Sequence, residues 1–441
     1  MDMLKLIRSD RSGKLIEVEN QPFSREFYSS LPVIDLDQAK DAQTIQGFGI
    51  AFTDASCSLL AKLPPEKRRE LLQELFLPGK LNLSMGRLNI GSSDYSTGIY
   101  SYNDTADDVE MKNFSIARDL EYLIPVLLET QQYRPDIFFF ASPWSPPAWM
   151  KAPATLCGGY MREKYLPAFA NYITRYLTSY RQAGINIRAV SMQNEADTTQ
   201  NSTMPQSLLH PDMEMELIGR LLPPRLRANA LDTKLWLYDH NYSGWHRVLY
   251  MLSDPEVAKY TDAVAWHPYD GKPEMIRAVK AAHPEIDFQL TEKGPNLRTD
   301  SPESNVCWWG EVISGALNNF CRSFSGWNLA LDEYGKPNLG SFDCAGLVEI
   351  NSQTGEISYS AQYYAFKHFA PYLRSGAVIL DAPANFPPAS GISIVCARNT
   401  GNSHVAILTN SDQKNGIIQL KYRNSWLRMV LPPGSISTVT F

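Results

Sequence analysis

The chain has 441 residues, 44% of them hydrophobic and 11% aromatic, with a formal net charge of −6. These values are typical of a globular protein with a large apolar core, and the length allows two or three domains. The mild acidity, without a cluster of Lys and Arg, argues against nucleic acid or an anionic membrane as a partner, because those surfaces require a concentrated positive patch.

The six cysteines show neither a CxxC motif nor metal-ligand spacing with the seven histidines. We therefore expect mostly free, buried thiols, no metal and no cofactor. Residues 1–19 carry charges every few positions, where a signal peptide needs an apolar segment, and no stretch is long enough to cross a membrane. The sequence leaves three localisations open: inside the cell, export as a mature form whose signal was removed, or export without such a signal. It also leaves the oligomeric state open.

In chain order, residues 4–19 predict a hairpin with a turn at 10–13. Eight short apolar runs typical of strands follow, separated by amphipathic stretches with helical spacing. The predicted strands are 46–55, 81–91, 137–147, 187–195, 235–241, 263–270, 288–294 and 324–332. The predicted helices include 64–76, 117–132, 165–184 and 308–320.

Eight strands alternating with helices predict an α/β fold, the (β/α)8 TIM barrel. A doubly wound sheet is the alternative, but it needs a Gly-rich phosphate loop, and GFGIAF at 47–52 has only a glycine pair within a strand. Residues 392–441 predict five more strands, so we expect a side β-sandwich domain formed by the N- and C-terminal segments. The expected domains are 1–40, 41–378 and 379–441, with the Pro-rich segment 381–390 as a linker.

Polar and aromatic residues follow the C-terminal ends of the predicted strands, where a barrel places its active site. For any single residue, a capped strand end or a satisfied loop position is the simpler interpretation. A set of such residues at the same end of all the predicted barrel strands favours a functional site instead. Its members are Asp54, Arg87, Asp94, Trp144, Asn194, Glu195, Asp239, His240, His267, Tyr269, Glu292, Trp327 and Asn328.

Two of these residues are glutamates, Glu195 in SMQNEAD and Glu292 in LTEKG. Two carboxyl groups about 5–5.5 Å apart can cleave a glycosidic bond with retention, one as proton donor and one as nucleophile. We expect Arg87 to hold Glu292 ionised and Tyr269 to donate a hydrogen bond to it. Asn194 is placed to hold the sugar 2-hydroxyl.

The predicted sugar site has further members. Trp144 and Trp327 offer apolar ring faces to a pyranose, and Asp94 offers an acceptor to its hydroxyls. Asp239 and His267 complete the substrate-binding set. A metal bound by the carboxyl pair together with Asp239, His240 and His267 is the alternative, but these residues lack the close spacing of a recognised metal site.

With these residues identified, the chain resembles glycoside hydrolase family 30, the family of the lysosomal glucosylceramidase and of bacterial and fungal β-glucanases and xylanases. The resemblance runs nearly end to end through GFGIAFTDAS, ASPWSPPAWMK, SDPEVAKYTDAVAWHPY, GWNLALDEYGKPN and QYYAFKHFAPYL. It implies a (β/α)8 barrel with a side β-sandwich, Glu195 as acid/base and Glu292 as nucleophile. The first sugar subsite that it implies consists of Arg87, Asp94, Trp144, Asn194, Tyr269, Trp327 and Asn338.

The chain departs from the family pattern at two places. Ala196 follows Glu195 where the family usually has proline, which predicts a less rigid backbone after the acid. Lys293 and Gly294 follow Glu292, where glucosylceramidases have a small residue and then cysteine. Lys293 either points into solvent or adds a cation near the glutamate pair.

We therefore predict a retaining β-glycosidase, glucosylceramidase-like and acting on β-D-glucosides. The alternatives are an endo-β-1,6-glucanase or another family 30 β-glycosidase of xylosidase or fucosidase type, and a binding protein for glycans or glycolipids without activity. The partner is accordingly a β-glucoside, a glycolipid or a glucan. Aromatic residues expected to face the aglycone are Tyr95, Tyr100, Tyr102, Trp308 and Trp309.

Overall fold

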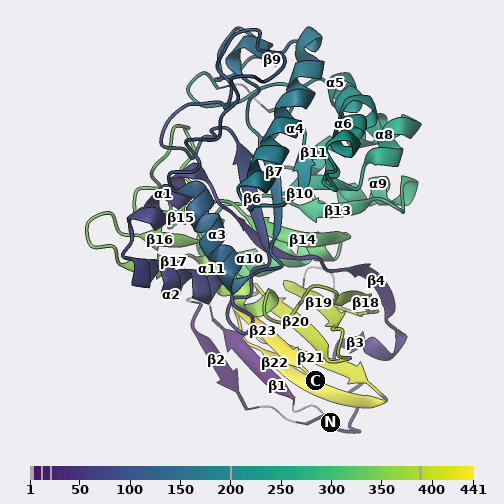
Figure 1. Cartoon of the computed structure of the whole chain (residues 1–441). Coiled ribbons are helices and arrows are strands. Elements are labelled where there is room, and N and C mark those ends of the chain that lie inside the picture. The colour runs from purple at the N-terminus through teal and green to yellow at the C-terminus, as the bar shows by residue number, and fades with distance from the viewer. Residues whose placement is uncertain (1–3, 11–12, 20–21, 199–200, 387–389) are drawn as a thin grey trace.

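The computed structural model describes residues 4–10, 13–19, 22–198, 201–386 and 390–441. A large α/β part occupies the upper half of Figure 1, and a smaller all-β part with both chain termini lies below it. The two parts have separate strand systems, a closed barrel above and antiparallel sheets below.

The upper part is a closed barrel of eight parallel strands, which confirms the predicted TIM barrel and excludes an open doubly wound sheet. The barrel closes where β14 pairs with β5 and β7 pairs with β10. Its strands are β5 (Gly47–Ala51), β6 (Met85–Ile90), β7 (Phe138–Pro143), β10 (Ile187–Ser191), β11 (Lys234–Asn241), β12 (Ala263–His267), β13 (Asp287–Leu290) and β14 (Cys321–Gly326).

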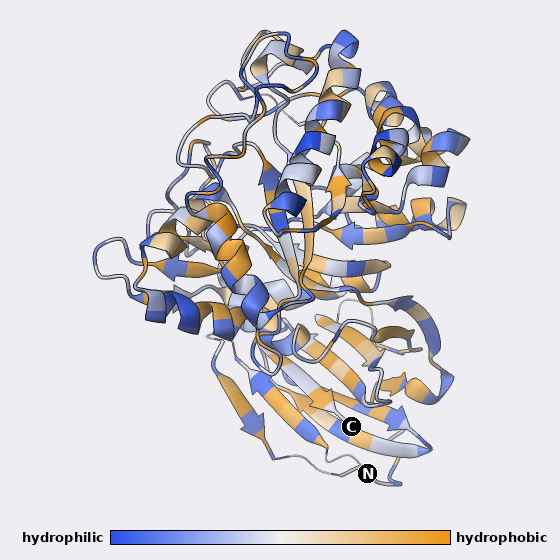
Figure 2. Cartoon of the chain, in the orientation of Figure 1, coloured by the Kyte–Doolittle hydropathy of each residue, from blue (hydrophilic) through white to orange (hydrophobic). Residues whose placement is uncertain are grey.

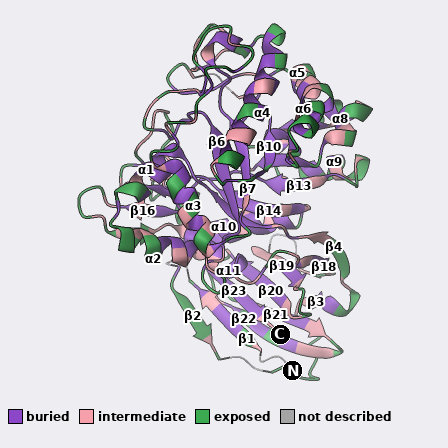
Figure 3. Ribbon diagram, viewed as in Figure 1, coloured by how far each residue is buried: buried purple, intermediate pink, exposed green. Residues whose placement is uncertain are grey.

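Helices surround the barrel and bury their apolar faces against it, which leaves buried strands inside and exposed outer helix faces in Figure 3. The α-helices are α1 (Asp54–Lys62), α2 (Pro65–Phe76), α3 (Leu123–Tyr133), α4 (Leu166–Gln182), α5 (Pro211–Glu216), α6 (Leu222–Ala228), α7 (Trp245–Leu252), α8 (Pro255–Tyr260), α9 (Arg277–Ala282), α10 (Val306–Leu317) and α11 (Ala361–Phe369). Shorter helical segments are η1 (Leu36–Gln38), η2 (Ala148–Met150), η3 (Glu163–Tyr165), η4 (Leu217–Leu221), η5 (Tyr242–Gly244), η6 (Pro273–Ile276) and η7 (Pro302–Ser304). Within the described ranges, no helix has the length and apolar character needed to cross a bilayer.

One predicted helix, 117–132, begins later than expected, because α3 starts at Leu123. Pro125 has no N–H to donate, so it fits only in the first turn of a helix, where N–H groups have no intrahelical acceptor. The preceding segment forms turns, and Asp119 accepts hydrogen bonds there from Tyr102 and Tyr180.

The lower part combines strands from both ends of the chain, as predicted. β1 and β2 form the N-terminal hairpin, and β1 also pairs with β23, the last strand. The seven-stranded sheet has the order β2 (Leu15–Val18), β1 (Lys5–Ser9), β23 (Ser435–Thr440), β20 (His404–Asn410), β19 (Ile392–Arg398), β18 (Val378–Asp381) and β4 (Lys40–Thr44). The three-stranded sheet has the order β22 (Ser425–Leu431), β21 (Gly416–Tyr422) and β3 (Val33–Asp35).

Alternating apolar residues on these strands, visible as orange and blue bands in Figure 2, give the two sheets a common core. Leu408 of one sheet and Leu420 of the other belong to the same buried cluster. Two small sheets complete the fold, β8 (Lys151–Ala152) with β9 (Tyr160–Met161), and β15 (Ala330–Leu331) with β16 (Val348–Ile350) and β17 (Ile357–Tyr359).

The domain boundaries at residues 40 and 378 stay a proposal. Strands β4, which starts at Lys40, and β18, which starts at Val378, pair with each other in the seven-stranded sheet. Residues 387–389 of the expected linker lie outside the described residues. In the described part of the chain, no disulfide joins the six cysteines, and four of them are buried.

Candidate active site

The site lies at the C-terminal ends of the barrel strands, where the backbone leaves its extended conformation. Glu195, Asp239 and Asn328 have positive φ angles of 50°, 64° and 62°, a region that non-glycine residues rarely occupy. At Glu195 the backbone N–H donates to the Asp239 carbonyl at 3.0 Å. Such conformations cost free energy and cluster at functional sites, because tertiary contacts must maintain them.

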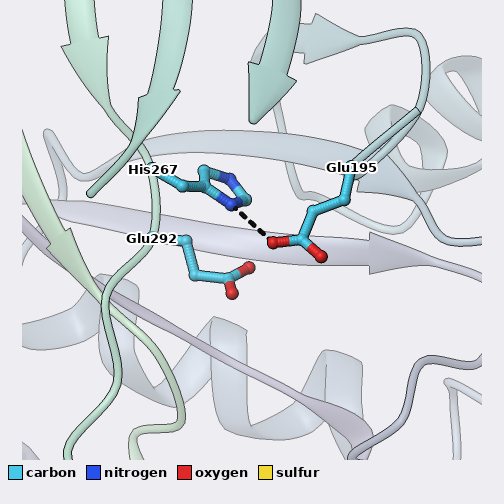
Figure 4. A group of neighbouring side chains, drawn as sticks. All are labelled: Glu195, His267 and Glu292. Atoms are coloured by element: carbon cyan, nitrogen blue, oxygen red, sulfur yellow. Dashed lines mark hydrogen bonds and ion pairs between the residues drawn. The ribbon is translucent and has the colours of Figure 1, made fainter. Parts of the chain in front are cut away.

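The two predicted glutamates face each other in the barrel mouth (Figure 4). One carboxylate oxygen of Glu195, one of Glu292 and a ring nitrogen of His267 all lie within 4.8 Å of one another. His267 Nδ1 is 3.1 Å from Glu195 Oε1, the contact dashed in Figure 4. The structure thus brings together two carboxyl groups that are almost a hundred residues apart in the sequence.

Arg87 is the buried cation beneath this pair. Its guanidinium group has no exposed surface, donates to the Glu292 carboxylate, and lies 2.8 Å from Asp239 Oδ2 and 2.9 Å from Asn194 Oδ1. The rings of Trp144 and Trp327 lie above it, with centroids 4.9 Å and 5.6 Å from Cζ. A planar cation with several donors can hold two carboxylates and an amide at once, which a lysine cannot.

Asp239 is the buried anion that orients the surrounding donors. Its carboxylate accepts hydrogen bonds from Ser142 Oγ, Ser191 Oγ and Thr291 Oγ1, each at 2.6 Å. It also lies 3.0 Å from Nε2 of His267. Burial opposes the charge of Asp239, but Arg87 and His267 together hold its pKa well below its usual range.

The charges at the site are coupled. Burial lowers the pKa of His267, but the charge of Glu292 and the hydrogen bonds with Asp239 and Glu195 raise it to about 9, so the ring is a cation at neutral pH. Two cations, Arg87 and His267, therefore face three carboxyl groups. The site is neutral when the glutamate pair shares one proton.

The two glutamates experience different environments. Burial raises the pKa of Glu292 above its ordinary value; the charges of His267 and Arg87 oppose this effect, and those of Glu195 and Asp239 add to it. At Glu195 burial acts in the same direction, but the hydrogen bond and charge of His267 bring the pKa below its ordinary value. These directions are the reverse of those that a Glu195 acid and a Glu292 nucleophile need during the reaction.

The glutamates open into a pocket of about 270 Å³, lined by predicted and unpredicted residues. Larger hollows of about 590 and 710 Å³ occur elsewhere in the described structure, but the strongly coupled charges meet in this one. Asp94 lies at the wall of this pocket, 5% exposed, and its buried Oδ1 has no hydrogen-bond partner in the structure. Burial raises the pKa of this carboxyl group well above its usual range, and the charges of Glu292 and Glu195 add to the effect.

Most of the predicted residues converge on this pocket. Trp144 and Trp327 stack on each other at 5.0 Å and border it, so part of each ring face is already covered. The hydroxyl of Tyr269 donates to Glu292 Oε1 at 3.1 Å, as expected. Asn338 differs, because its side chain bonds within its own loop, to the Phe342 carbonyl at 2.7 Å and the Gly340 N–H at 2.7 Å.

Several pocket residues were not found from the sequence. Thr198, Met204, Gln206, Asn241, Phe342 and Cys344 also line the wall. All of them except Asn241 come from loops beyond the strand ends, where no periodicity marks them. Asn241 is the last residue of β11, and its position beside Asp239 and His240 was the one available indication.

One expectation and one alternative need correction. Tyr95, Tyr102 and Trp309 are 0%, 3% and 0% exposed, so they belong to the core and do not face an aglycone. Of the two alternatives for Lys293, the one that points into solvent is wrong, since the side chain is 7% exposed. The less rigid backbone expected after Glu195 stays a prediction; the Ala196 carbonyl accepts from the Leu209 N–H at 3.0 Å.

For the metal alternative, the described structure brings three of the five predicted ligands close enough to share an ion, namely Glu195, His267 and Glu292. Both nitrogens of His267 are already engaged with carboxylates, and Glu292 is bound to Arg87. A metal ligand must offer a free lone pair, and a cationic imidazole offers none. The arrangement fits acid–base and nucleophilic chemistry better than metal binding.

A closed barrel with two carboxyl groups this close at its mouth is typical of retaining glycoside hydrolases, and the comparisons agree. The glycosyl hydrolase family 30 TIM-barrel domain matches residues 45–373. The chain belongs to this family. An endo-1,6-β-D-glucanase of Neurospora crassa is 31% identical over 88% of this chain and 86% of its own length. The lysosomal acid glucosylceramidase of Mus musculus is 25% identical over 98% and 87%.

Solved structures agree as well. The endo-β1,6-glucanase BT3312 has a TM-score of 0.87 at 26% identity, covering 99% of both chains. SrfJ from Salmonella typhimurium has a TM-score of 0.92 at 25% identity, covering 100% of this chain and 99% of its own. The similarity therefore includes the side β-domain as well as the barrel.

Proposed function

We propose that the protein hydrolyses β-D-glucosidic bonds with retention of configuration, Glu292 acting as nucleophile and Glu195 as acid/base. The observation that carries the proposal is the approach of the two carboxyl groups to within 4.8 Å. Retaining enzymes need a gap of about 5–5.5 Å between carboxyl groups, whereas inverting enzymes need about 6.5–9.5 Å to admit a water molecule.

The roles are assigned from contacts. Glu292 accepts hydrogen bonds from Arg87 and Tyr269, two donors that stabilise a carboxylate poised for attack. Glu195 lies 3.1 Å from the cationic ring of His267, which can return a proton to it. The pKa directions point the other way, so the assignment requires that a bound substrate reverse them. A glycosidic oxygen that accepts a hydrogen bond from Glu195 favours its protonated form, and a protonated Glu195 no longer raises the pKa of Glu292.

The first sugar would occupy the 270 Å³ pocket, which is small by the standard of ligand sites and suits one pyranose ring. Asp94 would accept hydrogen bonds from the sugar hydroxyls, since its Oδ1 has no hydrogen-bond partner among the described residues. Asn194 would hold the 2-hydroxyl, a contact that strengthens as positive charge develops on the sugar ring. Asp239 and His267 would contribute by fixing the charges around these groups.

Among β-glucosides, we propose β-1,6-linked glucan as the substrate. A relative named endo-1,6-β-D-glucanase supports this choice at 31% identity, and a solved endo-β1,6-glucanase supports it at a TM-score of 0.87. A putative glucosylceramidase of Caenorhabditis elegans is 30% identical and the mouse enzyme 25%, so the structural similarity carries the choice more than the identity does.

Glucosylceramide is the second candidate. Phe342 and Tyr269 border the pocket and are 49% and 41% exposed, so they offer apolar surface at its rim. The rates of hydrolysis of a β-1,6-glucan and of a short-chain glucosylceramide, measured with the same protein preparation, distinguish the two candidate substrates.

The test of the reaction class follows the anomeric configuration of the first product by NMR. Aryl β-D-glucoside is supplied beside the xyloside, galactoside and fucoside, and β-glucose released first is the expected result. Glu292→Gln should lose on the order of 10⁴-fold or more in kcat, as removal of a nucleophile does. Release of α-glucose, or full activity of this variant, would contradict the proposal.

A further inference from the structure

Lys293, the residue directly after Glu292, occupies a place that is unusual for a lysine. Its Nζ lies 3.2 Å from Glu303 Oε1, 4.2 Å from the ring centroid of Tyr269 and 5.2 Å from that of Trp308. The ammonium group is therefore enclosed by one carboxylate and two aromatic rings. Burial lowers its pKa, and Glu303 opposes that effect.

Tyr269 connects this cation to the glutamate pair. Its hydroxyl donates to Glu292 Oε1 at 3.1 Å and accepts from the Gly294 N–H at 3.0 Å. A cation over an aromatic ring is attracted by the negative ring face, which restricts the ring and draws electron density from it. A phenol that loses electron density is a stronger hydrogen-bond donor, and Glu292 receives that hydrogen bond.

We propose that Lys293 is a positioning residue for the nucleophile, acting through Tyr269. Its ammonium group holds the tyrosine ring in place and strengthens the hydrogen bond to Glu292, while Glu303 holds the ammonium group. The inference rests on the proposed role of Glu292. It goes beyond that role because it assigns a part in catalysis to a side chain that is not among those lining the pocket.

The free energy needed to bury a charge supports a role of Lys293 beyond packing. Burying a charged group costs free energy even when the group is paired, and an apolar side chain of similar length often stabilises a protein as well or better. Lys293 could also be purely structural and anchor η7, since it bonds Glu303 of that segment. The two explanations differ in whether the effect of Lys293 depends on the hydroxyl of Tyr269.

A double-mutant cycle on kcat separates them. Its members are the wild type, Lys293→Met, Tyr269→Phe and the double variant, assayed on whichever of the four aryl glycosides the wild type cleaves best. We expect Lys293→Met to lower kcat about three- to thirty-fold, the range of a desolvated cation–π contact, with little change in KM. In the Tyr269→Phe background the same change should alter kcat less than about twofold.

The pH profile gives a second readout. Loss of the cation and weakening of the phenol hydrogen bond should raise the pKa of Glu292, so the acidic limb of kcat/KM should move to higher pH in Lys293→Met. Lys293→Arg should keep both kcat and the pH of the acidic limb close to the wild-type values, since arginine also stacks on aromatic rings. The other titratable groups facing Glu292 are unchanged in these variants: Arg87, Asp94, Glu195, Asp239, His267 and Cys344.

Lys280→Met is the matched control. Its Nζ lies 5.7 Å from the ring centroid of Phe288, so a similar lysine–ring contact is lost away from the pocket, and kcat should stay unchanged. Thermal unfolding of each variant verifies that it folds. An equal loss of kcat in both tyrosine backgrounds, or a wild-type kcat and pH profile in Lys293→Met, would overturn the proposal. The wild type's preference among the four glycosides tests the glucoside assignment separately.

Discussion

Two buried histidines in different regions of this molecule have opposite protonation behaviour. His267 at the barrel mouth and His368 at the junction of barrel and β-domain are both 0% exposed. His267 lies between the carboxylates of Glu195 and Asp239, and its pKa rises to about 9 despite burial. His368 bonds the hydroxyls of Ser9 and Thr438, and burial lowers its pKa to about 3.

The difference in pKa between the two histidines reflects the groups that surround each of them. At the junction, α11 is joined to β1 and β23 through neutral hydrogen bonds, which satisfy the buried polar atoms of His368 without any charge. At the mouth, burial is combined with five ionisable groups whose charges compensate one another. Burial alone therefore does not mark a functional histidine, whereas burial among coupled carboxylates does.

Among the changes that test the role of the charged groups at the barrel mouth, substitution of Glu195 is expected to have the largest effect on activity. Glu195→Ala should lower kcat/KM about 10²- to 10⁴-fold for a glucoside with a poor leaving group, and less for one that needs no acid. Added azide should restore turnover and yield the β-glucosyl azide, identified by NMR. If Glu195→Ala gave the α-azide and Glu292→Ala the β-azide, the two roles would have to be exchanged.

The charges at the mouth should also affect stability more than charges at the surface. Arg87→Met removes the guanidinium group that contacts both buried carboxylates, Asp239 and Glu292, and should cost about 3–5 kcal/mol in the free energy of unfolding. Arg398→Met is the control, because its pair with Asp41 is 36% and 55% exposed and should be worth about 0–1 kcal/mol. Urea denaturation measures both, and equal losses would contradict the difference between the regions.

A substitution in the core of the β-domain should lower the stability of the protein without lowering its kcat. Leu408 is fully buried in the core shared by the two sheets, so Leu408→Ala should cost about 2–5 kcal/mol. The kcat of the folded variant should equal that of the wild type at a temperature well below unfolding. A clear fall in kcat would indicate that the β-domain shapes the pocket.

The remaining two effects appear only when the pH is changed. The pKa of His368 is about 3 when folded and near 6.5 when unfolded, so the unfolded chain binds the extra proton between these values. This contribution to stability is complete above pH 6.5 and is lost as the pH falls toward 3, by up to about 1.4 kcal/mol per pH unit. His368→Gln should show a shallower fall in unfolding free energy over that range.

His267 should act in the opposite direction. Its folded pKa of about 9 exceeds its unfolded value of 6.5, so its stabilising effect is complete below pH 6.5 and is lost as the pH rises through 9. Alkaline titration of the unfolding free energy in the wild type and in His267→Gln measures this. An acid-side effect at His267 would contradict its assignment as a buried cation.

The sequence predicted the elements whose pattern is local. All eight barrel strands and the five C-terminal strands were found from apolar runs and turn residues, because a strand or helix imposes its period on neighbouring positions. At 117–132 the apolar spacing predicts a helix that begins too early, because Pro125 limits where the helix can start. Both glutamates, Arg87 and Tyr269 were found because polar residues at strand ends share one rim.

Tertiary structure decided what depends on distance and burial. It placed Met204, Phe342 and Cys344 in the pocket wall, turned Asn338 back toward its own loop, and put Tyr95 into the core. It also determined the protonation of the coupled charges and enclosed Lys293 beside Tyr269. These properties arise from contacts between residues far apart in the chain, and a local pattern carries no information about such contacts.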